Sequence, residues 1–265
     1  MIETGNWKLE FVHRDDKKQM YRALALASKG AGFVSPNPMV GCVVVKSGRV
    51  IAKGYHQKFG EAHAEINALK MAEFRSPKSE VKGATVYINL EPCAHFGQTP
   101  PCVDALISAK PRRVVVGMKD PNSKTAGRGI RKLRSAGIEV TVGVLQEDCE
   151  ELNESFTKWI TTNKPFVVLK CALTLDGAFT LKRGTRSDFS SPESYARAHE
   201  LRLLYDAIAL GVGSVNIDNP RLTCRLSGRK TRNPLRVIFD TRLRVREDAR
   251  MFGEEGRTII FTGPG

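Results

Sequence analysis

One histidine and two cysteines from three separate segments, His63, Cys93 and Cys102, constrain the fold of this chain more than any other feature. A neutral imidazole and two thiolates are the ligand set of a catalytic zinc ion that keeps its fourth position open for water. Side chains so far apart in the sequence can bind one ion only if the fold brings the ends of several elements together. The sequence therefore predicts a metal site built from element termini.

A carboxylate stands two residues after the histidine, at Glu65. Zinc lowers the pKa of a bound water toward neutrality, and a carboxylate beside it can take the water proton and pass it on. Hydrolytic removal of an amino group from a heteroaromatic ring requires this transfer, because ammonia leaves poorly unless it is protonated. The combination of these four residues is typical of a zinc-dependent deaminase.

Each expected ligand lies at the end of a predicted element. These elements are a helix over 61–72, a strand over 84–90 and a helix over 103–109. His63 and Glu65 fall near the N-terminus of the first helix, and Cys93 follows the strand. Sites in open α/β sheets lie at the carboxyl ends of strands. Cys102 opens the second helix, where a thiol has a lowered pKa.

Two other interpretations of these residues remain open. Taken singly, each of them is more often a buried structural residue than a ligand, and only the combination favours a metal. The gap between Cys93 and Cys102 is also longer than the two-residue spacing that is common in deaminases, and it contains His95 as a rival ligand. We favour Cys102 as the ligand and expect His95 beside the substrate or the ligands.

The first part of the chain alternates strands and helices, which predicts a three-layer α/β/α domain over 1–161. Its other expected elements are a helix from Asp15 or Asp16 to Lys29 capped by aspartate, a hairpin of strands 40–46 and 49–54, strands 113–117 and 138–142, and helices 129–136 and 146–160. A short polar linker ends at Pro165, and a second part follows over 165–265. There we expect a helix over 192–204 and strands over 166–173, 207–211 and 235–239.

Four stretches of the first part, 36–41, 63–65, 90–102 and 120–122, resemble the bifunctional deaminase/reductase family of riboflavin biosynthesis. The long cysteine gap is that family's own variant. The resemblance implies a cytidine-deaminase-like domain that holds zinc on His63, Cys93 and Cys102 and uses Glu65 as proton donor and acceptor. It also implies the substrate 2,5-diamino-6-(5-phosphoribosylamino)pyrimidin-4(3H)-one, with Asn37 holding the pyrimidine. The substrate contacts that it implies in this part are Asn37, His56, His95, Asp120 and Asn122.

The second part resembles the family's reductase domain in the stretches 165–170, 173–177, 199–202, 206–208 and 213–223. This resemblance implies a dihydrofolate-reductase-like α/β fold that reduces the ribosyl group of the deaminated product with NADPH. The implied cofactor contacts are Ala172, Ser214 and Asp218, and the implied substrate contacts are Arg202, Leu222 and Arg225.

Two departures from the family concern this reductase half. Asp188, or Phe189 if the loop shifts, stands where the family usually has a tryptophan beside the nicotinamide, and an acidic side chain there would repel the NADPH phosphates. The family's reductase also continues beyond the length seen here. We therefore expect an incomplete reductase-like domain over 165–265 that oxidises little or no NADPH.

The amino-acid composition restricts the class of protein and the cellular compartment in which we expect it. Hydrophobic residues make up 41% of the 265, which is enough for a sizeable core. The six cysteines do not indicate a disulfide framework, and the polar N-terminus predicts neither a signal peptide nor a membrane segment, so we expect a cytoplasmic protein. We expect exposed sheet edges in the second part, and because such edges need to be covered, we also expect a homo-oligomer.

The net charge of +14 indicates anionic ligands such as a sugar phosphate and a dinucleotide, and nucleic acid is a competing interpretation. A base deaminase that acts on tRNA is therefore an alternative, although the cysteine spacing and the reductase-like second part argue against it. A non-catalytic zinc module is another. The turn at Gly127-Arg128-Gly129 is either a phosphate cradle or a simple connection to the next helix, with equal support for both.

Overall fold

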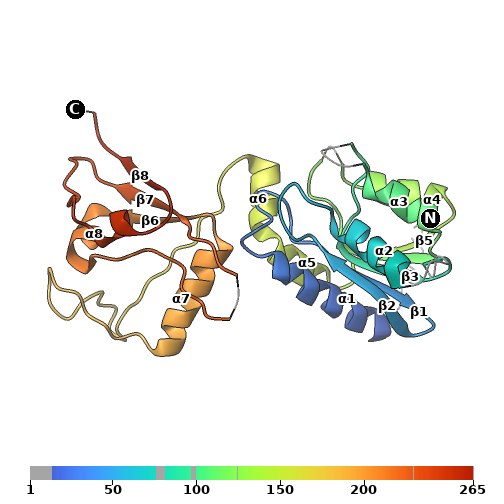
Figure 1. The fold of residues 1–265 in the computed structure, drawn as a ribbon, viewed down its shortest axis with the longest axis horizontal. Coiled ribbons are helices and arrows are strands. Elements are labelled where there is room, and N and C mark those ends of the chain that lie inside the picture. Colours follow the sequence, from blue (N-terminus) through green and yellow to red (C-terminus); the bar gives the residue numbers. More distant parts are fainter. Residues whose placement is uncertain (1–13, 76–80, 97–99, 124, 229, 265) are drawn as a thin grey trace, which may run out of the picture. The chain divides into compact units, whose positions relative to one another are not determined.

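The computed structural model describes residues 14–75, 81–96, 100–123, 125–228 and 230–264 of the chain (Figure 1). The chain forms two compact units, residues 1–166 and 167–265. Within the described residues no helix is both long and apolar enough to cross a membrane.

A five-stranded mixed sheet with the strand order β2-β1-β3-β4-β5 forms the centre of the first unit. Its strands are β1 (Gly41–Lys46), β2 (Arg49–Tyr55), β3 (Thr85–Leu90), β4 (Arg113–Met118) and β5 (Glu139–Val142). β1 pairs antiparallel with β2 and with β3, whereas β3, β4 and β5 run parallel. The predicted hairpin is confirmed, and Ser47 and Gly48 turn it with positive φ values of 50° and 75°.

Helices cover both faces of this sheet, which confirms the three-layer α/β/α prediction. They are α1 (Arg14–Ala27), α2 (Ala64–Arg75), α3 (Cys102–Ala109), α4 (Arg128–Ser135), α5 (Gln146–Leu152) and α6 (Glu154–Thr162). A Cβ atom on Gly41 would lie 2.0 Å from Ala23 O in α1, and one on Gly54 would lie 2.5 Å from Ala64 O in α2. Gly54 pairs with Cys42, the neighbour of Gly41, so these two glycines point to opposite faces and place α1 and α2 on opposite sides. α5 contacts α1 on one side, and α3 connects α2 with α4 on the other.

The central strands β1, β3 and β4 supply most of the core because both of their faces are covered. They read as near-continuous apolar runs, as strands buried on two faces do. Their fully buried side chains include Cys42, Val43, Val44, Val86, Ile88, Val114, Val115 and Val116.

A buried ion pair fastens α1 to the sheet. The helix begins at Arg14, so Asp16 lies in its first turn and does not cap it as the sequence predicted. The Asp16 carboxylate accepts a hydrogen bond of 2.9 Å from the Tyr87 hydroxyl and binds Arg113 in a bidentate pair of 2.9 and 3.1 Å. Burial, followed by this bond to Asp16, raises the pKa of Tyr87. One carboxylate thus connects α1 to β3 and β4.

The predicted helix over 146–160 is wrong in one respect, because it is broken at Asn153 into α5 and α6. The buried Asn153 side chain accepts a hydrogen bond from Met39 N at 2.8 Å and donates one to Met39 O at 3.1 Å. These bonds join Asn153 to a loop residue that lies 114 positions earlier in the sequence. The break therefore serves a tertiary contact that helical periodicity does not reveal.

The second unit contains a parallel sheet with the order β6-β7-β8. Its elements are α7 (Pro192–Leu204), β6 (Ala207–Gly211), α8 (Val212–Asp218), β7 (Leu235–Phe239) and β8 (Thr258–Phe261). The predictions of α7, β6 and β7 are confirmed, and the sequence did not reveal α8 or β8. Ser191 caps α7 by accepting a hydrogen bond from Ser194 N, and Pro192 follows it.

The predicted strand over 166–173 is wrong. These residues form no regular element, and Val167 and Leu169 are 81% and 86% exposed. Their apolar character suits a strand, but the described residues provide no partner for it. The core of this unit is small and consists of Val212, Val215, Leu222, Ile238, Ala249 and Met251.

We expect Asp16→Ala to lower the free energy of unfolding by about 1 to 3 kcal/mol, because the Tyr87 hydroxyl loses its acceptor and the Arg113 guanidinium keeps only Thr141 and Glu139 as partners. Urea unfolding followed by circular dichroism measures this loss. The matched control is Asp15→Ala, which removes an exposed carboxylate from the same turn and should change stability by only about 0.5 kcal/mol. Equal effects of the two variants would contradict the role given to Asp16.

Candidate metal centre and active site

The three predicted zinc ligands meet at one edge of the first sheet. Cys93 lies in the loop that follows β3, and Cys102 is the first residue of α3. His63 lies one residue ahead of α2, because the helix predicted from 61 begins only at Ala64. Its carbonyl accepts the hydrogen bond of 3.0 Å from Asn67 N that opens the helix. All three ligands therefore come from backbone that the adjoining elements hold in place.

The distances between the ligand atoms fit a tetrahedral zinc site. His63 Nδ1 lies 3.7 Å from Cys93 Sγ and 3.2 Å from Cys102 Sγ, and the three ligand atoms all lie within 4.8 Å of one another. Ordinary Zn–S and Zn–N bond lengths place tetrahedral neighbours about 3.6 Å apart. The arrangement can hold the metal through one nitrogen and two sulfurs, with a fourth position for water.

The sulfur of Cys93 is stabilised as a thiolate. The hydrogen bond from the Cys102 thiol, followed by the effect of His63 and of the Cys102 backbone N–H, lowers the pKa of Cys93 to about 4. The N–H of Cys102 lies 3.2 Å from this sulfur at the N-terminus of α3, where negative charge is favoured. The same bond between the two sulfurs raises the pKa of Cys102 far above its usual value.

Glu65 is the second residue of α2 and is only 3% exposed. Its burial, together with the nearby Cys93, raises the pKa of Glu65 to about 7. A carboxyl group with a pKa near neutrality can both accept and donate a proton. The structure therefore brings a suitable acid and base next to the three ligands.

Asn37 is connected to the metal centre through His56. His56 Nδ1 is 3.2 Å from Ala62 O, so this nitrogen carries the proton, and His56 Nε2 then accepts the hydrogen bond of 3.2 Å from Asn37 Nδ2. The rings of His56 and His63 meet edge to face at 5.3 Å. His56 is 2% exposed, and burial lowers its pKa. These contacts connect Asn37 to a metal ligand.

His95 is exposed and does not belong to the group that could hold a metal among the described residues. Residues 97–99 of the same loop lie outside the described part of the chain. The prediction of Cys102 as the third ligand, in preference to His95, agrees with this geometry. The expected substrate contact of His95 stays a prediction.

Asp120 and Asn122 lie in the loop between β4 and α4. The Asp120 carboxylate accepts hydrogen bonds within this loop, from Asn122 N at 2.9 Å and from Thr125 Oγ1 at 2.5 Å. These bonds give Asp120 a structural role in shaping the loop, and the substrate contacts predicted for Asp120 and Asn122 stay predictions.

A buried carboxylate that the sequence did not reveal, Glu91, lies between this loop and the metal ligand. It accepts hydrogen bonds from the backbone of Asp120, Gly127 and Ile130. The N–H groups of Gly127 and Ile130 are thus already bonded and are not free to bind a phosphate. This favours a simple connection to α4, and the phosphate cradle stays a prediction. An acidic residue that directly follows the buried strand β3 is the signal that could have found Glu91.

The second unit brings Arg202 and Arg225 together beside His199. Arg202 Nη1 donates to His199 Nδ1 at 3.1 Å, and Arg225 N donates to the same atom at 3.0 Å. Arg225 Nη1 also donates to Thr223 Oγ1 at 2.7 Å. Burial, followed by repulsion from Arg225, lowers the pKa of Arg202. Two neighbouring cations of this kind suit a phosphate group.

The other predicted substrate and cofactor contacts of the second unit are less closely associated with the arginine pair. Leu222 is buried directly before Thr223, which places it next to the arginine pair. Ser214 and Asp218 are exposed on α8, and Ala172 lies in a segment without regular structure. No described hydrogen bond or ion pair joins these three to the arginines. Asp188 accepts hydrogen bonds from Arg186 and Tyr195 on Oδ1, at 2.9 and 2.8 Å, so neighbouring groups hold one oxygen of its carboxylate.

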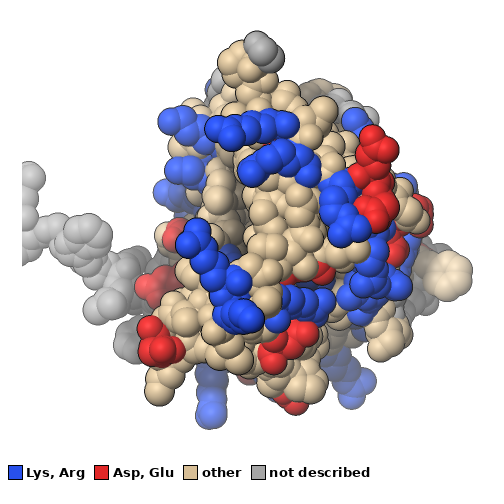
Figure 2. Space-filling view, turned by 90° about the vertical axis from the view of Figure 1, so that its left-hand side faces the viewer, with Lys and Arg blue, Asp and Glu red and all other residues tan. Residues whose placement is uncertain are grey.

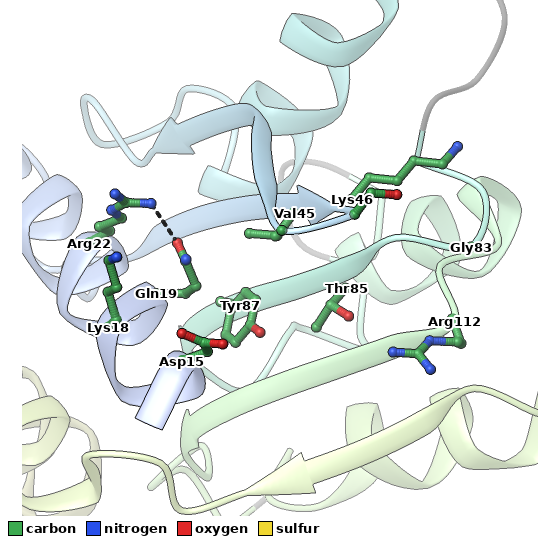
Figure 3. A pocket seen from close by; sticks show the side chains of 12 residues that line it. Asp15, Lys18, Gln19, Arg22, Val45, Lys46, Gly83, Thr85, Tyr87 and Arg112 are labelled. Atoms are coloured by element: carbon green, nitrogen blue, oxygen red, sulfur yellow. Dashed lines mark hydrogen bonds between the residues drawn. The ribbon is translucent and has the colours of Figure 1, made fainter. Parts of the chain in front are cut away.

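A separate cavity of about 560 Å³ opens at the other end of the first sheet (Figure 3). It lies beside the start of β3 and the end of β1, whereas the metal ligands lie beyond the end of β3. Its charged and aromatic lining residues include Asp15, Lys18, Arg22, Lys46, Tyr87 and Arg112. None of the predicted site residues lines this cavity.

Comparison with known proteins agrees with this architecture. Residues 13–118 match the cytidine and deoxycytidylate deaminase zinc-binding region, and residues 165–264 match the RibD C-terminal domain. The riboflavin biosynthesis protein RibD of Aquifex aeolicus is 46% identical over 252 residues, which cover 95% of this chain and 69% of the relative. RibD of Escherichia coli is 41% identical over 254 residues, covering 92% and 68%.

A solved structure from Thermotoga maritima, a diaminohydroxyphosphoribosylaminopyrimidine deaminase/5-amino-6-(5-phosphoribosylamino)uracil reductase, has a TM-score of 0.86 and 45% identity to this chain. The match covers 93% of this chain and 69% of that one, so the chain spans about two thirds of the length of these relatives. The fold and the site define a zinc-binding deaminase domain joined to an α/β reductase-type domain. The chain belongs to the RibD family.

We expect Cys93→Ser and Cys102→Ser to reduce bound zinc from one ion per chain to well below half, because each variant removes a thiolate from a three-residue ligand set. Elemental analysis of the purified protein measures the metal. The matched control is Cys171→Ser, which changes an exposed cysteine of the second unit and should leave the metal content unchanged. Full zinc occupancy in either ligand variant would contradict the assignment.

Proposed function

We propose that this protein catalyses the zinc-dependent hydrolytic deamination of 2,5-diamino-6-(5-phosphoribosylamino)pyrimidin-4(3H)-one, a step of riboflavin biosynthesis. The observation that carries the proposal is the convergence of His63, Cys93 and Cys102 beside the buried carboxylate of Glu65. The similarity to RibD proteins along 92 to 95% of the chain supports the choice of substrate. It also disfavours a tRNA base deaminase, which would account for the first unit alone.

In this proposal each residue has a defined task. When bound, zinc would supply an acidified water. Glu65 would take one proton of this water and pass it to a ring nitrogen, and would then take the remaining proton from the hydroxyl added to the ring carbon and give it to the amine, which leaves as ammonia. Asn37, oriented by its bond to His56, holds the pyrimidine, and Asn122 approaches it from the β4–α4 loop.

We also propose that the second unit acts on the deaminated product as an NADPH-dependent reductase. The match to the RibD C-terminal domain over residues 165–264 supports this, and the pair of Arg202 and Arg225 suits the substrate phosphate. The same match shows that a reductase-type domain is present, in contrast to the incomplete domain expected from the departures in sequence. The cofactor role of Ala172, Ser214 and Asp218 stays a prediction.

The basic character of the protein fits anionic substrates. Lys and Arg outnumber Asp and Glu by 42 to 28, and Figure 2 shows basic side chains around an uncharged area of one face. A positive field of this kind raises the rate at which phosphorylated ligands arrive. We further propose a cytoplasmic location, which the six free cysteines support. The homo-oligomer stays a prediction.

We expect Glu65→Gln to retain zinc and to lose at least about 1,000-fold in kcat for ammonia release from the diaminopyrimidine ribotide, because the amide cannot shuttle the proton. A coupled ammonia assay measures the rate. Glu61→Gln is the control, since Glu61 is exposed four residues earlier, and it should keep normal activity. Unchanged turnover in Glu65→Gln would rule out the assigned role. A wild-type enzyme that deaminates an RNA stem-loop and ignores the ribotide would contradict the proposed substrate.

We expect Arg202→Ala to weaken binding of the deaminated ribotide to the second unit by about tenfold or more, because it removes a charged hydrogen-bond donor from the proposed phosphate site. Titration calorimetry on a chain that also carries Glu65→Gln measures this affinity. Arg197→Ala is the matched control, since Arg197 lies on the same helix but pairs with Glu200 at the surface. If both variants bind with wild-type affinity, the phosphate site lies elsewhere.

A further inference from the structure

Glu91 is a buried carboxylate at the junction between β3 and the metal ligand Cys93. It is 5% exposed and directly follows the last residue of β3. Its own N–H donates to Met118 O at 2.9 Å, so its backbone extends the pairing of β3 with β4. A carboxylate in this environment is costly unless its oxygens accept hydrogen bonds.

The carboxylate receives three backbone N–H groups from one segment. Oε2 accepts from Asp120 N at 3.2 Å and from Gly127 N at 2.9 Å, and Oε1 accepts from Ile130 N at 3.1 Å. Asp120 and Gly127 are the two ends of the loop that contains Asn122. Glu91 therefore holds this loop at both ends and also bonds the first turn of α4, where a negative charge is favoured.

Close packing adds to these bonds. A Cβ atom on Gly129 would lie 2.2 Å from Pro92 O and 3.3 Å from Glu91 Oε1, so α4 approaches the turn before Cys93 as closely as its backbone permits. On the other side, Cys93 O accepts a hydrogen bond of 3.2 Å from Val103 N in α3. The turn that carries the metal ligand Cys93 is thus held between the N-terminal ends of α3 and α4.

We propose that Glu91 is a positioning residue for the deamination reaction, because it fixes the loop that carries Asn122 at a set distance from the turn that carries Cys93. The inference rests on the proposed function. The hydrogen bonds that the Glu91 carboxylate accepts come from backbone N–H groups of the loop and of α4. Glu91 acts through Asn122, whose placement decides how well the pyrimidine ribotide binds beside the metal.

Glu91→Gln tests this role, because the amide has nearly the same shape but turns one acceptor oxygen into a donor that faces a backbone N–H. We expect an increase in KM for the ribotide of about tenfold, a kcat within about threefold of wild type and an unchanged zinc content. Hydrogen exchange of the peptide over 119–130 should become faster, while exchange in β1 and β3 stays the same. This readout does not depend on activity.

Two further variants make the test specific. Gly129→Ala leaves Glu91 in place but adds a methyl group that meets Pro92 O, so it should raise KM and accelerate exchange over 119–130 in the same way. Asp104→Asn is the matched control. It removes a charge and the ion pair between α3 and Lys132 of α4 without touching the loop, and it should change neither value.

The outcomes separate the two proposals. Wild-type KM and wild-type loop exchange in Glu91→Gln would overturn the positioning role. Loss of zinc, or faster exchange throughout β3 and β4, would also overturn it, because Glu91 would then support general stability only. If the wild-type enzyme releases no ammonia from the ribotide, the proposed function fails, and loop exchange still shows whether Glu91 sets the position of the loop.

Discussion

The pairing of backbone groups at the end of β3 is the constraint on which the site of the first unit depends. The strand delivers Glu91, Pro92 and Cys93 into the protein interior, where unpaired N–H and C=O groups are costly. The start of α3 and the start of α4 provide the missing partners, through Val103 N to Cys93 O and through three N–H groups to the Glu91 carboxylate. The same contacts bring Cys102 next to Cys93. The hydrogen bonds that pair these backbone groups therefore also bring two of the metal ligands together.

Buried polar side chains organise the loops around this edge. Asn89 accepts a hydrogen bond from Gly41 N and donates one to Met39 O, and Asn153 bonds both backbone groups of Met39. These bonds hold the loop that carries Asn37 toward the metal centre, much as Glu91 holds the loop that carries Asn122. A fully bonded buried polar group specifies one arrangement, because any displacement leaves it unsatisfied. These bonds therefore fix the positions of the loops that carry Asn37 and Asn122.

The two units differ in how many hydrophobic side chains they bury. The first surrounds its sheet with helices on both faces and forms one continuous core. The second forms a three-stranded sheet over a core of six buried residues and leaves Phe239 and Phe261 stacked at 5.7 Å but 57% and 55% exposed. Its arginine pair nevertheless forms a defined cluster around His199. This cluster joins α7 to the segment around Arg225, whereas the metal centre needs three elements brought together.

The sequence by itself determined the ligand set, the hairpin, the buried strands and helix α7, because residue chemistry, apolar periodicity and capping residues are local signals. It also determined the family, since the cysteine spacing and the stretches around it are specific. Only the tertiary structure decided that His63 precedes its helix, that Asn153 breaks the helix predicted over 146–160 and that 166–173 forms no strand. It alone revealed Glu91 and the hydrogen bond from Gly127 N to its carboxylate. The break at Asn153 and the contacts of Glu91 depend on hydrogen-bond partners distant in the sequence, such as Met39 for Asn153 and Gly127 for Glu91, and local patterns carry no information about such partners.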